Sequence, residues 1–352
     1  MQPVEYSQFL KRWVEKFDRD QSWLGSAGKT PPDQAEINDS WQQLVTFNTQ
    51  DFDREARLLR NQTQAGLIYR LLNGTDSFED TVRVTTQMAE SALYASLSHH
   101  RTILEQAFGA PSNPAFTILG MGKLGGRELN LSSDIDIFCV FAEDGETSGP
   151  RVRDHGDYFT RLTQQLVKSL DAQTVDGFVE RVDQRLRPWG SAGQLAIPVV
   201  ACEDYYEVHG REWERFALLK ARPVAGDIAL GDALLKSLKP FMYRKYLDFG
   251  VFESIRDLKS KIEAEVRRNG RDKNVKVGRG GIREIEFIVQ AMQLLRGGQI
   301  PSLQVTGFLD ALSMLMTEAI IGEQDGLQLK EDYLWLRYVE HVIQAENDQQ
   351  TQ

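Results

Sequence analysis

The sequence has little cysteine and no long apolar segment. Two cysteines, Cys139 and Cys202, cannot build a framework of several disulfides, which is typical of a reducing compartment. Residues 1–17 carry five charged side chains, so this segment lacks the apolar core of a signal peptide. No stretch approaches the roughly 20 apolar residues of a membrane-spanning helix. We therefore expect a cytoplasmic protein with no membrane partner.

Positive charge is also scarce. The chain of 352 residues has 41 Lys and Arg against 51 Asp and Glu, giving a formal net charge of −10. This balance lacks the broad basic surface of nucleic-acid binding proteins, so we expect no nucleic-acid partner. Cations that bind phosphate must then be local. The five histidines show no metal-ligand spacing, and we assign them no role: His99, His100, His155, His209 and His341.

The most informative segment, 116–141, places a glycine turn ahead of two carboxylates. A strand is predicted at 116–119, followed by a short helix and by a strand at 134–141 that begins with Asp134 and Asp136. Side chains alternate along a strand, so both carboxylates face one side. The opposite, core-facing side carries Ile135, Ile137, Cys139 and Phe141. Neighbouring carboxylates usually share a cation, and hard oxygen ligands without His or Cys favour Mg²⁺.

Two other phosphate-binding motifs resemble this turn superficially. Gly120-x-Gly122-x-x-Gly125 matches a dinucleotide fingerprint, but that motif opens a full crossover helix. Residues 126–133 are too few for such a crossover between parallel strands. The Walker loop also fails, because Lys123 is followed by Leu124 and not by Ser or Thr.

A third carboxylate follows on a strand predicted at 177–187. Asp183 shares one face with Arg181, Arg185 and Arg187. A solvated polar face is one interpretation. The other is that the strand returns beside 134–141, which makes Asp183 a third metal ligand and places guanidiniums near phosphate oxygens. Three carboxylates on neighbouring strands can hold two Mg²⁺ ions for an in-line phosphoryl displacement.

Apolar periodicity divides the chain into three regions. We expect an N-terminal helical region at 1–110, a catalytic core at 111–200 and a C-terminal helical region at 201–352. Helices are predicted at 151–172, 259–267, 282–295 and 333–347. The last helical pattern runs almost to Gln352 without a Gly or Pro stop, so we expect a fragment of a longer chain. The predicted fold class is helix-rich α+β with a small mixed sheet.

The motifs resemble one enzyme family closely. They are Gly-Met-Gly-Lys-Leu-Gly-Gly-Arg-Glu-Leu-Asn (120–130), Ser-Ser-Asp-Ile-Asp (132–136) and Arg-Val-Asp-Gln-Arg-Leu-Arg-Pro (181–188), with further matches at 203–206, 210–215, 220–222, 280–287 and 347–352. The chain resembles the bifunctional glutamine synthetase adenylyltransferase/adenylyl-removing enzymes, over about two-thirds of its length. Met121, Asn130, 283–286 and 347–352 look like the N-terminal, adenylyl-removing half. The adenylyl-adding half would lie beyond residue 352.

This resemblance implies a DNA polymerase β-like nucleotidyltransferase core and a specific reaction. Inorganic phosphate attacks the AMP phosphorus on a glutamine synthetase tyrosine, giving ADP and unmodified synthetase, under control of a PII signalling protein. Asp134, Asp136 and Asp183 would be catalytic and hold Mg²⁺. The residues expected to contact ADP, AMP or phosphate are Gly120, Gly122, Gly125, Gly126, Ser132, Ser133, Arg185, Arg187, Lys220 and Arg222.

Several interpretations stay open at this point. The serines are equally suited to a plain turn, and Lys123 and Arg127 to solvated loop charges. The basic run 267–283 would contact phosphate or an acidic protein, or be solvated. Of Glu284 and Glu286, one is expected to favour the helix dipole and the other to reach the site. Alternative functions are the adenylyl-adding reaction with ATP, and a catalytically silent docking module.

Overall fold

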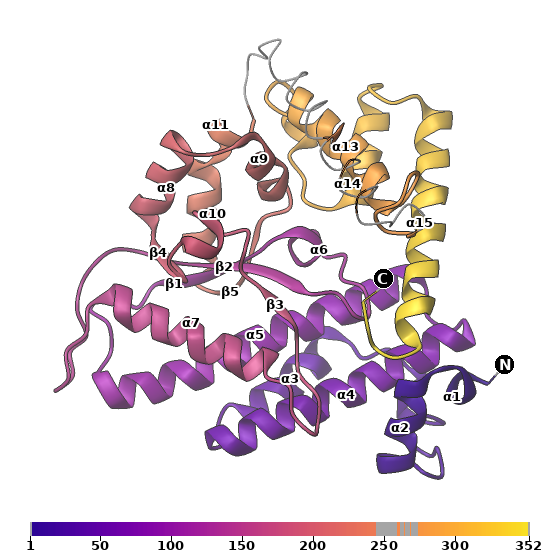
Figure 1. Ribbon diagram of the computed structural model, residues 1–352, viewed down its shortest axis with the longest axis horizontal. Coiled ribbons are helices and arrows are strands. Elements are labelled where there is room, and N and C mark those ends of the chain that lie inside the picture. The colour runs from indigo at the N-terminus through magenta and orange to yellow at the C-terminus, as the bar shows by residue number, and fades with distance from the viewer. Residues whose placement is uncertain (1, 244–258, 261–263, 265–267, 269–273, 351–352) are drawn as a thin grey trace.

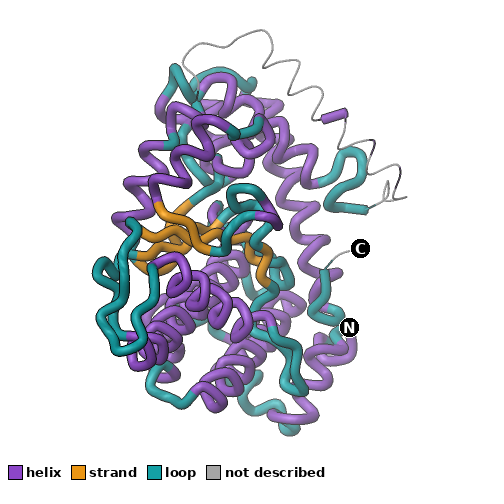
Figure 2. Tube along the Cα trace, turned by 60° about the vertical axis from the view of Figure 1, so that its left-hand side comes forward, coloured by secondary structure: helices purple, strands orange, loops and turns teal. Residues whose placement is uncertain are grey.

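The computed structural model describes residues 2–243, 259–260, 264, 268 and 274–350. Helices surround a small mixed sheet that lies in the middle of the molecule (Figures 1 and 2). This is the helix-rich α+β class that the sequence predicted. Within these described residues, no helix combines the length and apolar character needed to cross a membrane.

The N-terminal region is helical, as predicted. Local sequence explains several of its boundaries: the Asn48 side chain caps α4 by accepting from Asp51 N, and Ser77 forms a capping box at the start of α5. The helix α4 ends at Gly74, whose φ of 68° is a left-handed conformation that glycine adopts freely. The elements are α1 (Pro3–Tyr6), α2 (Gln8–Phe17), η1 (Ala27–Lys29), α3 (Gln34–Leu44), α4 (Thr49–Asn73) and α5 (Phe78–Phe108).

Five short strands form the sheet. They are β1 (Phe116–Gly120), β2 (Ile135–Phe141), β3 (Val182–Asp183), β4 (Ala196–Pro198) and β5 (Arg222–Gly226). The order is β3-β2-β1-β5, and β4 also pairs with β2. The strand β1 runs antiparallel to β2 and β5, whereas β3 and β4 run parallel to β2.

Both faces of β2 are buried beyond Asp136. Ile137 and Cys139 belong to a core shared with α4, α5 and the helix α7 (His155–Asp171). Phe138 and Val140 pack into a second core, formed with α8 (Val199–Val208), α9 (Glu212–Leu218), α10 (Ile228–Ser237) and α11 (Lys239–Met242). The predicted core-facing side of β2 is confirmed. The face that carries Asp136 continues with Phe138 and Val140, and these two residues are buried in the second core.

The strand predicted at 177–187 is wrong over most of its length. Only Val182 and Asp183 pair with β2. Before them, the backbone N–H groups of Val179 and Glu180 donate to the carbonyl of Leu170 at the end of α7. After them, the Asp183 carboxylate accepts the N–H of Arg185 at 2.8 Å. Such a side-chain turn competes with the strand and ends it.

Two strands, β4 and β5, lie in segments where no strand was predicted. We predicted helix beyond about residue 200, yet β5 pairs with β1 there, and β4 was not predicted. Pro223 lies in β5, which among the described strands pairs with β1 alone, and the register shifts beside it. Proline is tolerated in such an edge strand because its missing N–H is not required on the open side.

The C-terminal helices have their own core. Ile285, Val289, Leu312 and Tyr333 are among its buried residues. The predicted helix at 282–295 is confirmed, and the one predicted at 333–347 is the last part of a longer helix that begins at Glu323 and ends at Ala345. The helix predicted at 259–267 lies largely outside the described residues. The elements are α13 (Ile282–Arg296), η3 (Pro301–Leu303), α14 (Phe308–Thr317) and α15 (Glu323–Ala345).

Candidate active site

The glycine turn forms the four-residue helix α6 (Gly122–Gly125) between β1 and β2. Because β1 and β2 are antiparallel neighbours, no crossover joins them, which agrees with rejecting the dinucleotide motif. Gly122 has φ 51°, and a Cβ there would lie 2.9 Å from Asp136 Oδ2. A Cβ at Gly125 would lie 1.7 Å from the carbonyl oxygen of Lys220. Gly122 therefore makes room for a carboxylate, and Gly125 for a neighbouring backbone.

The strand register brings the predicted carboxylates together. Asp136 in β2 is the direct partner of Asp183 in β3. Neighbouring strands lie about 4.8 Å apart, so these two side chains emerge side by side. Asp134 precedes β2, and its Oδ1 accepts from Arg181 Nε at 2.8 Å. Arg185 Nε donates to Asp183 Oδ2 at 2.8 Å.

The three carboxylates have different electrostatic environments. Burial, and then the charges of Asp183 and Asp134, raise the pKa of Asp136 to about 6. Burial alone would raise the pKa of Asp183 as well, but the hydrogen bonds from Arg185 outweigh it and lower that pKa. Among the described residues, none donates a hydrogen bond to the Asp136 carboxylate or forms an ion pair with it. Asp136 is the carboxylate that most needs an added cation.

These residues suit Mg²⁺ chemically, although they do not converge as a finished site. In the described part of the chain, no three His, Cys, Asp or Glu side chains are grouped closely enough to hold a metal ion. Arg181 and Arg185 hold the carboxylates of Asp134 and Asp183. Asp136, with the space at Gly122 beside it, fits an anchor ligand. To bind the metal, Asp134 would give up its ion pair with Arg181, and Asp183 its ion pair with Arg185.

Three of the four predicted phosphate-binding cations are committed to contacts within the protein. Arg187 donates to the carbonyl oxygens of Gly193, Gln184 and Ser191 at 2.7 to 3.2 Å. Lys220 Nζ lies 2.8 Å from Glu128 and 3.2 Å from Glu286. Arg222 pairs with Glu90 and donates to the carbonyls of Leu124 and Gly125. Arg185 differs, because its side chain is 79% exposed.

The two serines also differ. The Ser132 hydroxyl donates to Asp348 Oδ1 at 2.9 Å, and its backbone N–H donates to Gln344 Oε1 at 3.2 Å. Ser132 therefore has a structural partner. The Ser133 hydroxyl oxygen is buried and has no hydrogen-bond partner among the described residues. The remaining predicted glycines, Gly120 and Gly126, lie against the side chains of Val224 and Glu128.

Lys123, Glu284 and Glu286, whose roles the sequence left undecided, each lie in surroundings that shift the pKa of the side chain. Glu284 accepts the N–H of Gly280 at 2.8 Å, and this bond and Lys259 lower its pKa. Burial opposes ionisation of Glu286, but Lys220 lowers its pKa to about 2. Burial lowers the pKa of Lys123 to about 8, so it is not a plain solvated charge. Residues 267 and 269–273 of the basic run lie outside the described residues.

Sequence reasoning missed the residues that support the carboxylate loop from behind. Arg337, His341 and Asp348 contact Asn130 or Ser132, as described below. The available signal was the spacing of polar residues at 337, 341 and 344 within an otherwise amphipathic helix.

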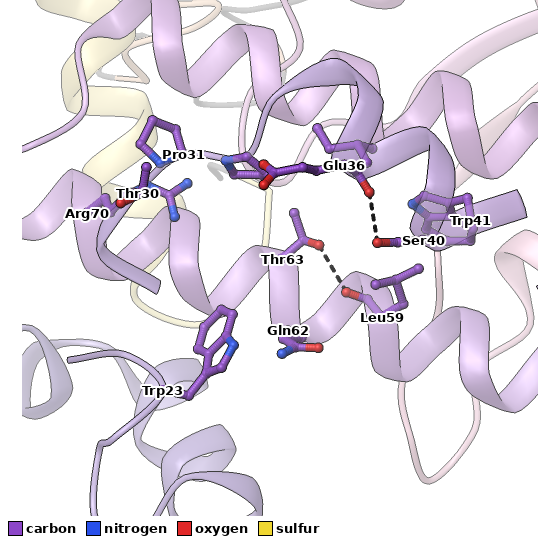
Figure 3. A pocket seen from close by; sticks show the side chains of 12 residues that line it. Trp23, Thr30, Pro31, Glu36, Ser40, Trp41, Leu59, Gln62, Thr63 and Arg70 are labelled. Carbon is purple, nitrogen blue, oxygen red and sulfur yellow. Dashed lines mark hydrogen bonds between the residues drawn. The ribbon is translucent and has the colours of Figure 1, made fainter. Parts of the chain in front are cut away.

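A separate cavity lies among the N-terminal helices (Figure 3). Its volume is about 370 Å³, and Trp23, Trp41 and Arg70 are part of its lining. None of its lining residues is a predicted site residue. Arg70 is bound to Asp76 and to the carbonyl of Gly28, so we assign this cavity no chemistry.

Comparisons with known proteins identify the family of this chain. Residues 4–237 match the family model described as glutamate-ammonia ligase adenylyltransferase, and residues 256–352 match that of GlnD PII-uridylyltransferase. Bifunctional glutamine synthetase adenylyltransferase/adenylyl-removing enzymes are similar to most of the chain. The one from Hahella chejuensis is 48% identical over 86% of this chain and 32% of its own length. The enzyme from Pseudomonas putida is 47% identical over 85% of this chain and 31% of its own length. The enzyme from Stenotrophomonas maltophilia K279a is 44% identical over 88% of this chain and 34% of its own length.

The chain thus spans about a third of the length of the curated relatives it matches. The family model covers both the N-terminal helices and the sheet that carries Asp134, Asp136 and Asp183. The chain belongs to the glutamate-ammonia ligase adenylyltransferase family of nucleotidyltransferases.

Proposed function

We propose that this chain is an adenylyl-removing domain that acts on glutamine synthetase. Inorganic phosphate attacks the phosphorus of AMP esterified to a synthetase tyrosine, and the products are ADP and unmodified synthetase. The similar proteins are named as bifunctional enzymes that add and remove adenylyl groups. The assignment to the removing half rests on the resemblance at Met121, Asn130, 283–286 and 347–352.

One observation carries the proposal of phosphoryl chemistry at this site. The direct pairing of Asp136 with Asp183 places two carboxylates side by side, with Asp134 two residues from Asp136. Clustered carboxylates are costly unless they bind a cation. Bound Mg²⁺ would supply positive charge that stabilises the transferring phosphoryl group and the departing phenolate.

The chain's own groups bind and orient the reactants. Asp134, Asp136 and Asp183 would hold the metal, and the backbone from Gly120 to Gly126 would contact phosphate oxygens. Arg185 is exposed and can turn toward an incoming anion once the Asp183 carboxylate binds a metal. The bond from phosphorus to an oxygen of inorganic phosphate forms as the bond to the tyrosyl oxygen breaks. The tyrosinate then takes a proton.

Two protein partners follow from this proposal. Glutamine synthetase is the substrate, as the names of the related enzymes state for those proteins. A PII signalling protein is the expected regulator. The match of residues 256–352 to a PII-uridylyltransferase model supports a link to that signalling system.

The decisive experiment measures phosphate-dependent ADP release from adenylylated glutamine synthetase, with and without Mg²⁺. We expect release by the 352-residue chain and loss in the Asp134→Ala, Asp136→Ala double variant. Asp144→Ala is the matched control, because Asp144 is an exposed residue of the loop after β2. Undiminished release by the double variant would contradict the site assignment.

The same assay distinguishes the two alternatives. Transfer of AMP from ATP to unmodified synthetase, with release of pyrophosphate, would indicate the adenylyl-adding direction. Tight binding of a partner with no turnover under Mg²⁺ and phosphate would indicate a docking module.

A further inference from the structure

One face of α15 and the turn after it hold the loop that leads into β2. Arg337, His341, Gln344 and Asp348 are separated by three or four residues, so they lie on one side of the helix and its extension. Figure 1 shows α15 reaching from the C-terminal helices down to α4, beside the loop before β2. Residues 128–132 of this loop contact all four side chains, which we call the holding face of α15.

The upper contacts of the holding face are buried hydrogen bonds to Glu128 and Asn130. Arg337 Nε donates to Asn130 Oδ1 at 2.9 Å, and Arg337 Nη2 donates to the carbonyl of Glu128 at 2.6 Å. His341 Nε2 lies 3.0 Å from the same Asn130 oxygen. Arg337 and His341 are almost fully buried. Buried bonds of this kind exclude alternative positions of the loop, because a broken bond leaves an unsatisfied polar group.

The lower contacts converge on Asp348. Its carboxylate accepts from both terminal nitrogens of Arg60, from Gln64 Nε2 at 3.1 Å and from the Ser132 hydroxyl at 2.9 Å. Asp348 is only 6% exposed, and its φ of 54° is uncommon for a residue with a side chain. Such a conformation persists where the surroundings determine it. The loop is thus tied to α4 and α15 at one carboxylate.

Ser132 connects this carboxylate to the candidate active site. Arg181 Nη2 donates to the Ser132 hydroxyl oxygen at 3.0 Å, and Arg181 Nε donates to Asp134 Oδ1 at 2.8 Å. The guanidinium therefore bridges a structural serine and a predicted metal ligand. A continuous chain of hydrogen bonds runs from Asp348 through Ser132 and Arg181 to Asp134.

We propose that Asp348 is a positioning residue for the active-site carboxylate Asp134. It fixes Ser132, whose hydroxyl and carbonyl oxygens both accept from Arg181 Nη2, and Arg181 in turn holds Asp134. This inference rests on the proposed function, because it assigns Asp134 to the metal site. It also makes the segment after α15 part of that site, although it lies more than 200 residues away in the sequence.

Two variants test the chain of contacts at different points. Ser132→Ala removes the hydroxyl and leaves the Arg60–Asp348 ion pair intact, and Asp348→Asn removes the charge at its centre. The matched controls break equivalent buried contacts elsewhere. Ser169→Ala removes a hydroxyl bond to Asp53, and Asp76→Asn disrupts the buried pair with Arg70.

Two measurements are made on each variant of the 352-residue chain, below its unfolding transition. The first is amide hydrogen exchange over residues 128–136, which reports the loop itself. The second is binding of Mn²⁺ alone, followed by the paramagnetic signal of the free ion. We expect Ser132→Ala and Asp348→Asn to speed exchange in this segment and to weaken Mn²⁺ binding about 10-fold, as loss of outer contacts does in metal sites. The controls should show neither change.

The outcomes separate this inference from the proposed function. If the unaltered chain binds Mn²⁺ but exchange and affinity are the same in both test variants, the positioning role is wrong and the metal site stands. Equal effects in test variants and controls would likewise overturn it, by showing general destabilisation. If the unaltered chain binds no Mn²⁺, the proposed metal site is itself wrong, and this role for Asp348 is wrong with it.

Discussion

The acidic and the basic residues around β2 differ in how far the protein itself satisfies them. Asp136 is partly buried, and no described residue donates to its carboxylate. Lys220, in contrast, is held by two carboxylates, and Arg187 by three carbonyl oxygens. Asp136 is therefore open to a cation, although Arg181 and Arg185 hold the carboxylates of Asp134 and Asp183, whereas most of the predicted phosphate-binding cations already serve the fold. Charge pattern alone does not distinguish a group that binds a ligand from one that holds a loop.

The largest expected effect is at the acidic side. Asp183→Asn should lower phosphate-dependent ADP release by about 100-fold, because it removes a carboxylate from the proposed metal site. The measurement is the initial rate at saturating Mg²⁺ and phosphate.

Asp171→Asn is its control. Asp171 also lies beside β3, where its carboxylate accepts the N–H of Val182, but it does not face Asp136. A rate for Asp183→Asn equal to that of the control would remove Asp183 from the site.

The next effect concerns stability at the basic side. The pKa of Glu286 is about 2 in the folded protein, below its ordinary value of 4.5. A lowered pKa stabilises the folded state above the ordinary value, and this stabilisation is lost as the pH falls toward the folded value. Glu286→Gln should therefore lower the free energy of unfolding by about 3 kcal/mol at neutral pH, and the difference should vanish near the folded pKa.

Denaturant unfolding at a series of pH values measures this difference. A constant difference across that pH range would show that the ion pair with Lys220 is not its source.

Arg187 tests whether a predicted phosphate ligand is structural. Arg187→Lys should lower the free energy of unfolding by about 1 to 2 kcal/mol, because the compact ammonium lacks the planar fork whose three nitrogens reach three separate carbonyl oxygens. We expect KM for phosphate to change little. Thermal unfolding and steady-state kinetics measure the two quantities, and a raised KM with unchanged stability would restore Arg187 to the binding site.

Substitution of Arg185 should have the smallest effect, and it should change KM for phosphate more than it changes stability. Its side chain is exposed, so Arg185→Gln should change stability by less than about 0.5 kcal/mol. We expect KM for phosphate to rise about threefold, and this difference to shrink at high salt, which screens exposed charges. An unchanged KM would show that this guanidinium pairs with Asp183 and does not bind phosphate.

The local features of the site could be predicted because they depend on short spacing. Asp134 precedes an apolar strand and Asp136 lies at its start, and the short distance from Gly126 to Asp134 already excluded a crossover helix. One of the two interpretations of 177–187 placed that segment beside β2, and the structure confirms this position and adds the register that pairs Asp183 with Asp136. The length of that strand did not follow, because the Asp183 side chain itself turns the backbone after it.

The partners of the charged side chains could not be predicted in this way. Lys220 meets Glu128 and Glu286, which are 92 and 66 residues distant in the chain. Arg222 meets Glu90, which lies in α5. Neither pairing leaves a periodic signal in the sequence. The expected division of the chain into three regions at 1–110, 111–200 and 201–352 remains a prediction.

The sequence by itself determined the family to which this chain belongs and the local pattern of its candidate site, a glycine turn followed by two carboxylates. The glycine turn, Asp134 and Asp136 lie within a few residues of one another, where backbone geometry fixes which side chains share a face. Only the tertiary structure decided which charges are open and which are bound. It also brought Asp348 to Ser132, a contact across 216 positions that depends on how α15 packs beside α4. Long-range contacts depend on the packing of whole helices, and for that reason they leave no local pattern in the chain.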